Sequence, residues 1–350
     1  MKRHLVAVDI GGSKTAILVQ DARHGRRVYS EKLKTPAHGG LGVMLRLLDG
    51  QIDGLPGGRA SVKALGVAVP GHVDDTGHVV CAGNLDGWVD VPLRSQLEER
   101  YQVPVFVERD ANCAALGEKW MGAARKMDDF VFLALGTGVG AGLFLDGAIY
   151  RGVHFAAGEA GDMAFPAGKR KERPLPTISD VVGKNAIKKA ARRATGEKLS
   201  AAEALERAAK QRRLLRATRN VVEYLSACVV AISSLLDPEA ILFGGGTSEA
   251  GEPLLKRIRE AVAPQHVVRA RLMLAGLGTE SQLYGALWGA RNAASASSRR
   301  FGSGRVPPGG SRTNGSHRRG TSGSSARDAA RWASPAGRAK GEARTPAADG

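Results

Sequence analysis

Residues 5–20 read LVAVDIGGSKTAILVQ, and the whole architecture can be built outward from them. An apolar run reaches Asp9, a Gly-Gly pair reverses the chain, and a second apolar run begins at Thr15, which predicts two strands joined by a tight turn. The pattern returns at residues 130–145 as FVFLALGTGVGAGLFL. Because strand, glycine-rich turn and strand occur twice, the sequence predicts two mixed α/β domains with similar openings.

The remainder of the chain supplies helices and further strands. Helices are predicted over residues 41–52, 111–121, 178–195, 211–236, 252–262 and 282–292, and further strands over 28–33, 64–69, 103–107, 148–150 and 240–243. From about residue 295 onward, Gly, Ser, Arg, Pro and Ala dominate and large apolar side chains are almost absent. Such a composition cannot offset the entropy cost of folding, so residues 295–350 are predicted to form a disordered tail.

Composition excludes several classes of protein. With 350 residues, of which 43% are hydrophobic, the chain can bury two cores. No apolar run approaches the roughly 20 residues that span a bilayer, and the run after Arg3 is too short for a secretory signal. We therefore expect a cytoplasmic protein without a membrane segment. Cys81, Cys113 and Cys228 are far apart in the sequence, which excludes a disulfide framework and a thiolate zinc site.

The net charge of +17 is concentrated in residues 168–220 and 296–350, and the rest of the chain is nearly neutral. The basic tail could contact nucleic acid only nonspecifically, and a solvated appendage without a partner is the favoured interpretation. In the other segment, Lys184, Lys188 and Arg192 recur every four residues and line one face of a helix. That face either is solvated, which is favoured, or meets an acidic partner.

Three glycine-rich turns follow apolar strands and are candidate phosphate-binding loops. Glycine lets the backbone approach phosphate oxygens closely and present its N–H groups to them. The candidate nucleotide-binding residues are Asp9, Gly11, Gly12, Ser13, Lys14, Gly136, Thr137, Gly138, Val139, Gly140, Gly244, Gly245 and Gly246. No Walker A sequence is present. Residues 136–141 fit a loose dinucleotide fingerprint, but a hairpin rather than a helix is predicted to follow them, so we reject a Rossmann site.

Two carboxylates each admit a structural and a functional interpretation. Asp9 ends an apolar strand, where it either stabilises the turn by bonding nearby backbone N–H groups or lies near Mg²⁺ on a nucleotide. The adjacent Gly-Gly pair favours the second interpretation. Asp110 follows a strand and precedes a helix, so it is either an N-cap or a general base that accepts a hydroxyl proton during phosphoryl transfer. The local sequence leaves these two alternatives even.

Taken together, these residues resemble the ROK family of repressors, open reading frames and sugar kinases, within the actin-like ATPase superfamily. The resemblance runs from about Leu5 to Arg291 and rests on segments 9–14, 66–71, 84–88, 110–118, 135–142, 150–159 and 236–246. It implies an actin-like, ribonuclease H-like α/β fold of two domains with a cleft between them. The N-terminal domain would comprise residues 1–113, completed by the helix near 281–293, and the C-terminal domain residues 114–280. The habit of the family also implies a homodimer.

The resemblance further implies an ATP-dependent kinase that phosphorylates a hydroxyl of a glucose-like hexose. Asp110 would be the general base, and Gly71, Asn84, Glu159 and Asp162 would line the sugar side of the site. Mg²⁺ would arrive with the nucleotide. Catalysis of this kind consists mostly of positioning and charge neutralisation, with domain closure excluding water.

The sequence departs from the family pattern at three places. Arg109 stands where the family commonly has Asn, and a guanidinium pointing into the pocket would lower the basicity of Asp110. Asp162 stands where the family commonly has His, and the Cys-rich zinc loop that usually follows is missing, so no structural zinc is expected. These departures keep open the alternative of a catalytically impaired, ROK-type sugar- or nucleotide-binding regulatory protein. Specific DNA binding is not expected, because the strand beginning at Leu5 leaves no room for a preceding helix-turn-helix.

Overall fold

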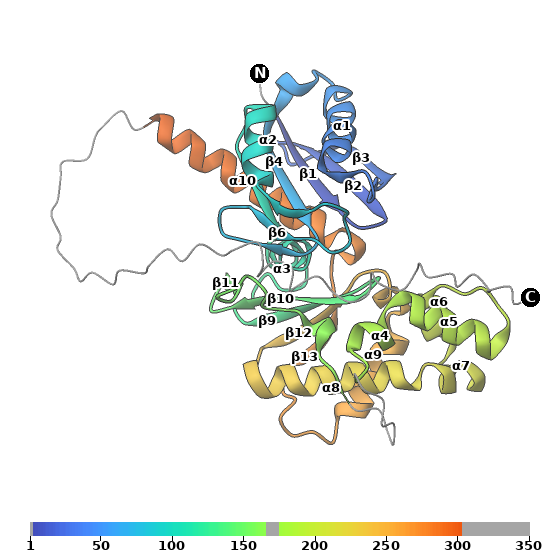
Figure 1. Ribbon diagram of the computed structural model, residues 1–350. Helices are drawn as coiled ribbons and strands as arrows, with labels where there is room; N and C mark the ends of the chain where they lie inside the picture. Colours follow the sequence, from blue (N-terminus) through green and yellow to red (C-terminus); the bar gives the residue numbers. More distant parts are fainter. Residues whose placement is uncertain (1–2, 166–174, 303–350) are drawn as a thin grey trace, which may run out of the picture.

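The computed structural model describes residues 3–165 and 175–302, without the side chains of residues 298–302. Its first domain is built on a five-stranded sheet with the order β3-β2-β1-β4-β8 (Figure 1). The strands are β1 (His4–Ile10), β2 (Lys14–Asp21), β3 (Arg27–Lys34), β4 (Val62–Val69) and β8 (Val105–Arg109). The first three form an antiparallel meander, and β4 and β8 join β1 in parallel. The predicted opening of strand, turn and strand is therefore present.

The second domain repeats this sheet. Its strands are β9 (Phe130–Leu135), β10 (Val139–Leu145), β11 (Ala148–Ile149), β12 (Ala240–Gly244) and β13 (Arg271–Leu274). Their order, β11-β10-β9-β12-β13, again places three antiparallel strands beside two parallel additions. The two-domain α/β fold predicted from the repeated glycine turns is confirmed, with two sheets of the same topology.

Strand register brings the carboxyl ends of the first sheet into line. Asp9 pairs with Ala68 on β4, and Ala68 pairs with Glu108 on β8. Because the three strands are parallel, the residues that follow them emerge at one edge of the sheet. Asp110 comes two residues after Glu108, so the two carboxylates singled out in the sequence share that edge.

Helices α3 (Asp110–Trp120) and α10 (Ser281–Gly302) pack against each other, and α10 also covers β1 and β4. Figure 1 shows α3 at the junction of the two domains. The helices approach closely because glycines face backbone: a Cβ added at Gly285 would lie 1.7 Å from the carbonyl oxygen of Cys113, and one at Gly117 would lie 2.2 Å from that of Ser281. The helix that begins at Asp110 is thus fixed by direct contact of two backbones.

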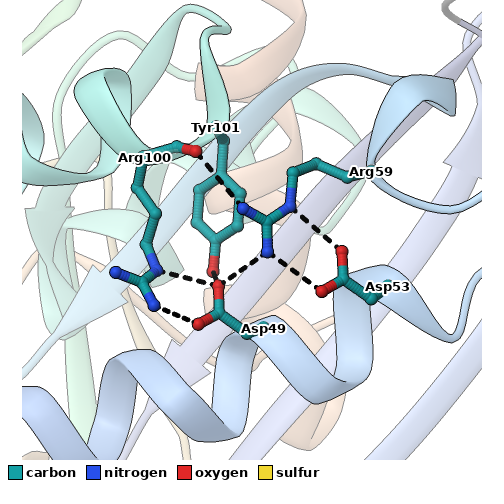
Figure 2. Close-up of polar contacts among 5 residues, drawn as sticks. All are labelled: Asp49, Asp53, Arg59, Arg100 and Tyr101. Atoms are coloured by element: carbon teal, nitrogen blue, oxygen red, sulfur yellow. Dashed lines mark hydrogen bonds and ion pairs between the residues drawn. The ribbon is translucent and has the colours of Figure 1, made fainter.

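The amino end of the first sheet carries an ion-pair cluster that joins α1 (Gly40–Asp53) to α2 (Leu93–Tyr101) (Figure 2). Asp49 accepts from Arg100, from Arg59 at 3.0 Å and from the Tyr101 hydroxyl at 3.1 Å, and Arg59 also pairs with Asp53 at 3.0 Å. Hydrogen bonding from Arg100 first, and then from Tyr101, holds the pKa of Asp49 below its usual range despite partial burial. Every charge in this cluster has a partner, which is the arrangement of a structural clamp rather than of a binding site.

A small third sheet was not predicted. It consists of β5 (His72–Val73), β6 (Val79–Cys81) and β7 (Val89–Val91). Strands of two or three residues are too short for an alternating pattern to be recognised in the sequence. This sheet positions residues 71–88 on the side of the first domain that faces the second domain, where β6 lies in Figure 1.

The helices of the second domain differ from two of the predicted helices. These helices of the structure are α4 (Ile178–Val182), α5 (Lys184–Thr195), α6 (Ala201–Arg207), α7 (Arg212–Ala217), α8 (Arg219–Leu236) and α9 (Glu252–Val262). The helix predicted over 178–195 breaks at Gly183, where a Cβ would lie 2.6 Å from the carbonyl oxygens of Ser179 and Thr137. The helix predicted over 211–236 breaks at Thr218, and α6 was not predicted.

Helix α8 is long and apolar enough to cross a membrane by length and composition alone. Its apolar side chains, including Val221, Leu225, Cys228 and Val229, are buried in the core of the second domain. It is therefore a core helix of that domain.

Helix α10 corrects the predicted start of the tail. It continues past Asn292 to Gly302, so residues 295–302 are helical. The Ala- and Ser-containing run after Asn292 does not interrupt a helix that is already packed on α3. The rest of the predicted tail, residues 303–350, lies outside the described residues.

Candidate active site

Asp9 and Asp110 lie at the shared strand edge of the first sheet, close enough for their charges to interact. Burial, and then the neighbouring charge of Asp110, raise the pKa of Asp9 to about 7. Burial also raises the pKa of Asp110, and the charge of Arg109 and the Ala111 N–H only partly oppose this shift. Two acids in one partly buried location are typical of a site that handles protons or cations.

The structure tests the structural alternatives for both carboxylates. The N-cap of α3 is Arg109, with φ −57° and ψ 140°, so Asp110 is the first helical residue and not the cap. Its Oδ1 still accepts from the Ala111 N–H at 2.7 Å, which leaves the other carboxyl oxygen available. For Asp9, no hydrogen bond from any described residue to its carboxylate is found, so it does not stabilise the turn in that way.

The first glycine loop, residues 10–14, is braced by threonines that the sequence analysis missed. Gly11 N–H donates to the carbonyl of Lys14 at 3.0 Å, which closes the turn. The Thr35 hydroxyl donates to the Gly11 carbonyl at 2.6 Å and contacts the Thr15 hydroxyl at 2.9 Å. Because the loop is held from behind, the side chains of Ser13 and Lys14 remain exposed and can meet a ligand.

The second and third glycine loops lie side by side in the second domain. Gly136 N–H donates to the Gly138 carbonyl at 2.9 Å, and Val139 N–H donates to the Ser179 hydroxyl at 3.1 Å. In the third loop, Thr247 N–H donates to the Leu135 carbonyl at 3.0 Å, directly before Gly136. A Cβ at Gly245 would lie 2.6 Å from the same carbonyl oxygen. The two loops thus form one continuous glycine-rich surface.

The residues predicted for the sugar side come from both domains. Gly71 has φ +89° and lies so close to β6 that a Cβ would meet the Cys81 carbonyl oxygen at 1.9 Å. Asn84 is exposed, and its Cβ would lie 3.1 Å from a Cβ added at Gly12, which joins this loop to the first glycine loop. Asp162 is exposed in the second domain, and partial burial followed by the charge of Glu159 raises its pKa.

Glu159 is the centre of a polar cluster that connects the two domains. Its Oε1 accepts from His72 Nε2 at 3.1 Å and from Arg109 Nη2 at 2.9 Å. Burial opposes its charge, but the His72 hydrogen bond and the Arg109 charge together hold the pKa of Glu159 below its usual value. Arg109 therefore points towards the second domain. The expectation that its charge lowers the basicity of Asp110 is right in direction, although burial outweighs it.

A second ion pair ties the domains together next to this cluster. Arg151, which follows β11, pairs with buried Glu108 through Nε at 2.9 Å and through Nη2 at 2.5 Å. The other oxygen of Glu108 accepts from the Arg109 N–H at 2.9 Å and from the Asn112 amide at 3.0 Å. The backbone that presents Asp110 is thus fixed from both domains.

The strand edge fits a Mg²⁺ ion that brings most of its own ligands. A neighbouring cation would favour the ionised form of Asp9, whose pKa burial otherwise raises. Within residues 3–165 and 175–302, no three His, Cys, Asp or Glu side chains gather into a metal site. An ion held by one carboxylate together with water and phosphate oxygens matches the habit of Mg²⁺. The segment in which the family's zinc loop would fall, residues 166–174, is outside the described residues.

Most of the supporting residues could not be recognised in the sequence. Thr35, His72, Arg151 and Ser179 carry no local motif, and each reaches its partner from a distant part of the chain. Two of them, His72 and Arg151, contact another side chain, and the other two contact the backbone of a glycine loop. Only spatial proximity reveals their roles.

Comparison with known proteins identifies both sugar kinases and repressors as relatives of this chain. The profile of the ROK family matches residues 5–293. A glucokinase from Halalkalibacterium halodurans is 32% identical over 319 residues, covering 82% of this chain and 94% of that protein. A xylose repressor from Caldicellulosiruptor bescii is 28% identical over 239 residues, covering 63% of this chain and 60% of the repressor. A crystal structure of a ROK family glucokinase from Streptomyces griseus, in complex with glucose and AMPPNP, has 29% identity and a TM-score of 0.68, covering 83% of this chain and 99% of that one.

Proposed function

The chain belongs to the ROK family, and on that premise we propose that it is an ATP-dependent sugar kinase that phosphorylates a hydroxyl of a glucose-like hexose. The observation that carries the proposal is the position of Asp110. It begins α3 at the carboxyl edge of the first sheet, beside Asp9, and burial raises its pKa. A carboxylate with a raised pKa is a stronger base towards a hydroxyl proton.

In the proposed reaction, the hexose hydroxyl oxygen forms a bond to the γ-phosphorus of ATP, and the bond from that phosphorus to ADP breaks. Asp110 accepts the hydroxyl proton through its unbonded carboxyl oxygen. Lys14, Ser13 and the backbone of residues 136–140 bind and orient the phosphates, and Asn84 and Glu159 hold other hydroxyls of the sugar. Asp9 would hold the Mg²⁺ that accompanies the nucleotide, and that ion would supply neutralisation of the phosphate charge.

Support for ATP and a hexose also comes from the relatives, because the Streptomyces griseus glucokinase bound glucose and AMPPNP. That protein shares the two-domain fold along nearly its whole length. We expect the reaction to take place in the cytoplasm and the protein to form a homodimer.

The second candidate function is a sugar- or nucleotide-binding regulatory protein without kinase activity. The observation that favours it is that one carboxyl oxygen of Glu159, Oε1, already accepts from both His72 and Arg109 and is therefore not free for a sugar hydroxyl. The xylose repressor among the relatives shows that proteins similar to this chain include regulators.

ATP consumption across a panel of hexoses and N-acetylhexosamines separates the two candidates. For the kinase, one or more sugars stimulate turnover, and Asp110→Asn lowers kcat by about 10²- to 10⁴-fold, the usual contribution of a general base. Asp53→Asn is the matched control, since it makes the same chemical change at an exposed residue of the remote cluster in Figure 2. If no sugar stimulates turnover of the wild type above that of Asp110→Asn, the kinase proposal fails. Calorimetric sugar binding without turnover would then favour the regulatory protein.

A further inference from the structure

The guanidinium of Arg109 lies close to two glycines, Gly140 and Gly158. A Cβ added at Gly140 would lie 3.5 Å from Nη2, and one added at Gly158 would lie 3.4 Å from Nη1. The guanidinium therefore passes between the end of the second glycine loop and the loop that carries Glu159. Only 5% of the Arg109 side chain is exposed, so it is not free to turn towards a ligand.

Within the part of the chain that the structure describes, the hydrogen bonds and the ion pair found for this guanidinium are made with one short loop of the second domain. Nη1 donates to the Ala157 carbonyl at 2.8 Å, and Nη2 donates to the Gly158 carbonyl at 3.3 Å and to Glu159 Oε1 at 2.9 Å. Bonds to successive acceptors along one backbone fix the orientation of that loop. The planar fork of arginine suits this task, and a lysine ammonium would reach only part of the set.

His72 holds the same carboxylate from the small sheet of the first domain. Hydrogen bonding with Cys81 first, and with Glu159 second, raises the pKa of His72 to about 9, so the ring is an imidazolium at neutral pH. Its Nε2 donates to Glu159 Oε1 at 3.1 Å, and its Nδ1 lies 3.8 Å from Cys81 Sγ. Glu159 thus accepts from two cationic side chains of the first domain, His72 on β5 and Arg109 at the junction of β8 with α3.

Both cations contact the same carboxyl oxygen. Among the described residues, no hydrogen bond or ion pair to Glu159 Oε2 is found, and a third of this side chain is exposed. A carboxylate anchored through one oxygen leaves the other as an oriented acceptor. Since Glu159 stays ionised, that oxygen accepts hydrogen bonds and donates none.

We propose that Arg109 and His72 are positioning residues that hold Glu159 so that its Oε2 accepts from one particular sugar hydroxyl, an assignment that rests on the proposed sugar-kinase function. Arg109 does not itself bind the sugar. The substrate class is then a hexose with a free hydroxyl that reaches Glu159 Oε2, and an analogue lacking this hydroxyl leaves that half-buried oxygen without a donor from the sugar.

Two substitutions of Arg109 separate its geometry from its charge. Arg109→Lys keeps the positive charge beside Asp110 but loses the fork, so the KM for the sugar should rise about tenfold or more, with kcat and the KM for ATP changed much less. The acidic limb of the pH profile of kcat/KM should stay in place. Arg109→Met loses the charge as well, and because Arg109 lowers the pKa of Asp110, that limb should move to higher pH.

Arg59→Met is the matched control, since it removes an arginine from ion pairs with Asp49 and Asp53 at the other end of the first sheet. It should leave both KM values and the pH profile unchanged. If Arg109→Met does not fold, Glu159→Gln breaks the same pair from the more exposed side and keeps the shape of the side chain. It should raise the KM for the sugar as Arg109→Lys does.

A wild-type KM for the sugar in Arg109→Lys would overturn the proposal, as would an equal rise in the KM for ATP. The His72 pKa, measured by NMR titration of its ring protons, tests the arrangement without any enzymatic turnover. Glu159→Gln should lower this pKa from about 9, because one of its two supporting hydrogen bonds is weakened. An unchanged His72 pKa would show that the pair with Glu159 does not exist. If the wild type turns over no sugar while the His72 result holds, the kinase proposal fails and the cluster stands.

Discussion

Replacing Gly285 with Ala should force apart the two helices that cross between the domains. The new Cβ would lie 1.7 Å from the Cys113 carbonyl oxygen, whereas real Cβ atoms essentially never come within 3.0 Å of such a neighbour. The obstacle is backbone on α3, which cannot turn aside as a flexible side chain can. Helix α10 or α3 must therefore shift by more than an ångström (about 1.3 Å at least, the difference between the two distances).

The magnitude follows from two opposing effects. Overpacking of a tight contact costs about 1 to 3 kcal/mol, and the depth of this overlap places Gly285→Ala at about 3 kcal/mol. Alanine in a helix recovers about 1 kcal/mol relative to glycine. The net loss is about 2 kcal/mol, which corresponds to a fall in Tm of roughly 5 °C for domains of this size.

Gly50→Ala in α1 is the control for this prediction. Nothing lies within 4 Å of the Cβ it would add, so only the gain from helix propensity remains. It should stabilise the protein by about 0.5 to 1 kcal/mol, and thermal melts of the two variants should move in opposite directions. Because α3 begins at Asp110, a displacement of about 1 Å at the crossing should also reduce kcat by up to about 100-fold in Gly285→Ala. Equal Tm values for the two variants would refute the close helix contact, and full kcat in a destabilised Gly285→Ala would refute its link to Asp110.

Three further changes test other parts of the molecule. Asp9→Asn should raise Tm by an amount that grows between about pH 4 and about pH 7, because folding raises the pKa of Asp9 from its ordinary value of 3.8 to about 7. The folded wild type keeps a proton that the unfolded chain has already lost, so its stability falls as pH rises through this window; a pH-independent gap would contradict the burial of Asp9. Glu118→Gln should lower the free energy of unfolding, measured by urea denaturation, by about 3 kcal/mol. Buried Glu118 accepts from the N–H groups of residues 123, 276 and 277 and from the Ser281 hydroxyl. An unchanged urea midpoint would count against these bonds. Asp237→Gly should raise the free energy of unfolding by about 1 kcal/mol in the same measurement. Exposed Asp237 follows the last residue of α8 with φ +42° and places a negative charge at the carboxyl end of the helix. A loss of stability would show that the Asp237 side chain itself stabilises the protein.

The repeated sheet could be predicted from sequence because local patterns encode it. Apolar runs of strand length separated by Gly-Gly or Gly-x-Gly give the strands and the turn between them, and both copies have the same order in the structure. The helix break at Gly183 could not be predicted, since the helical period continues through it. At Gly183 the backbone leaves the helical region, with φ −56° and ψ 139°, and the next N–H, that of Lys184, donates to the Gly136 carbonyl at 2.9 Å. A tertiary contact with a glycine loop overrides the local preference in this case.

In the candidate site too, features set by the local sequence could be predicted, and features set by distant residues could not. Asp9 and Asp110 could be chosen from the sequence because each follows an apolar strand, and parallel strands end at a common edge. Whether Asp110 was an N-cap or a general base could not be decided from the sequence, because an acid between a strand and a helix suits both roles and the helix start cannot be placed to one residue. The structure places that start at Asp110, with Arg109 in the cap position.

Arg109 demonstrates how a departure from a family pattern changes meaning once its contacts are known. From the sequence, a guanidinium in place of an amide suggested a damaged sugar pocket, because Arg has no acceptor and could have pointed at the substrate. Its acceptors lie 48 to 50 positions away, at residues 157–159, and no local pattern connects the two segments. The same charge that lowers the pKa of Asp110 keeps Glu159 ionised. A change at Arg109 therefore acts on both the proposed base, Asp110, and the proposed sugar-binding carboxylate, Glu159, so the kinetic effects of Arg109 and Glu159 variants should be non-additive.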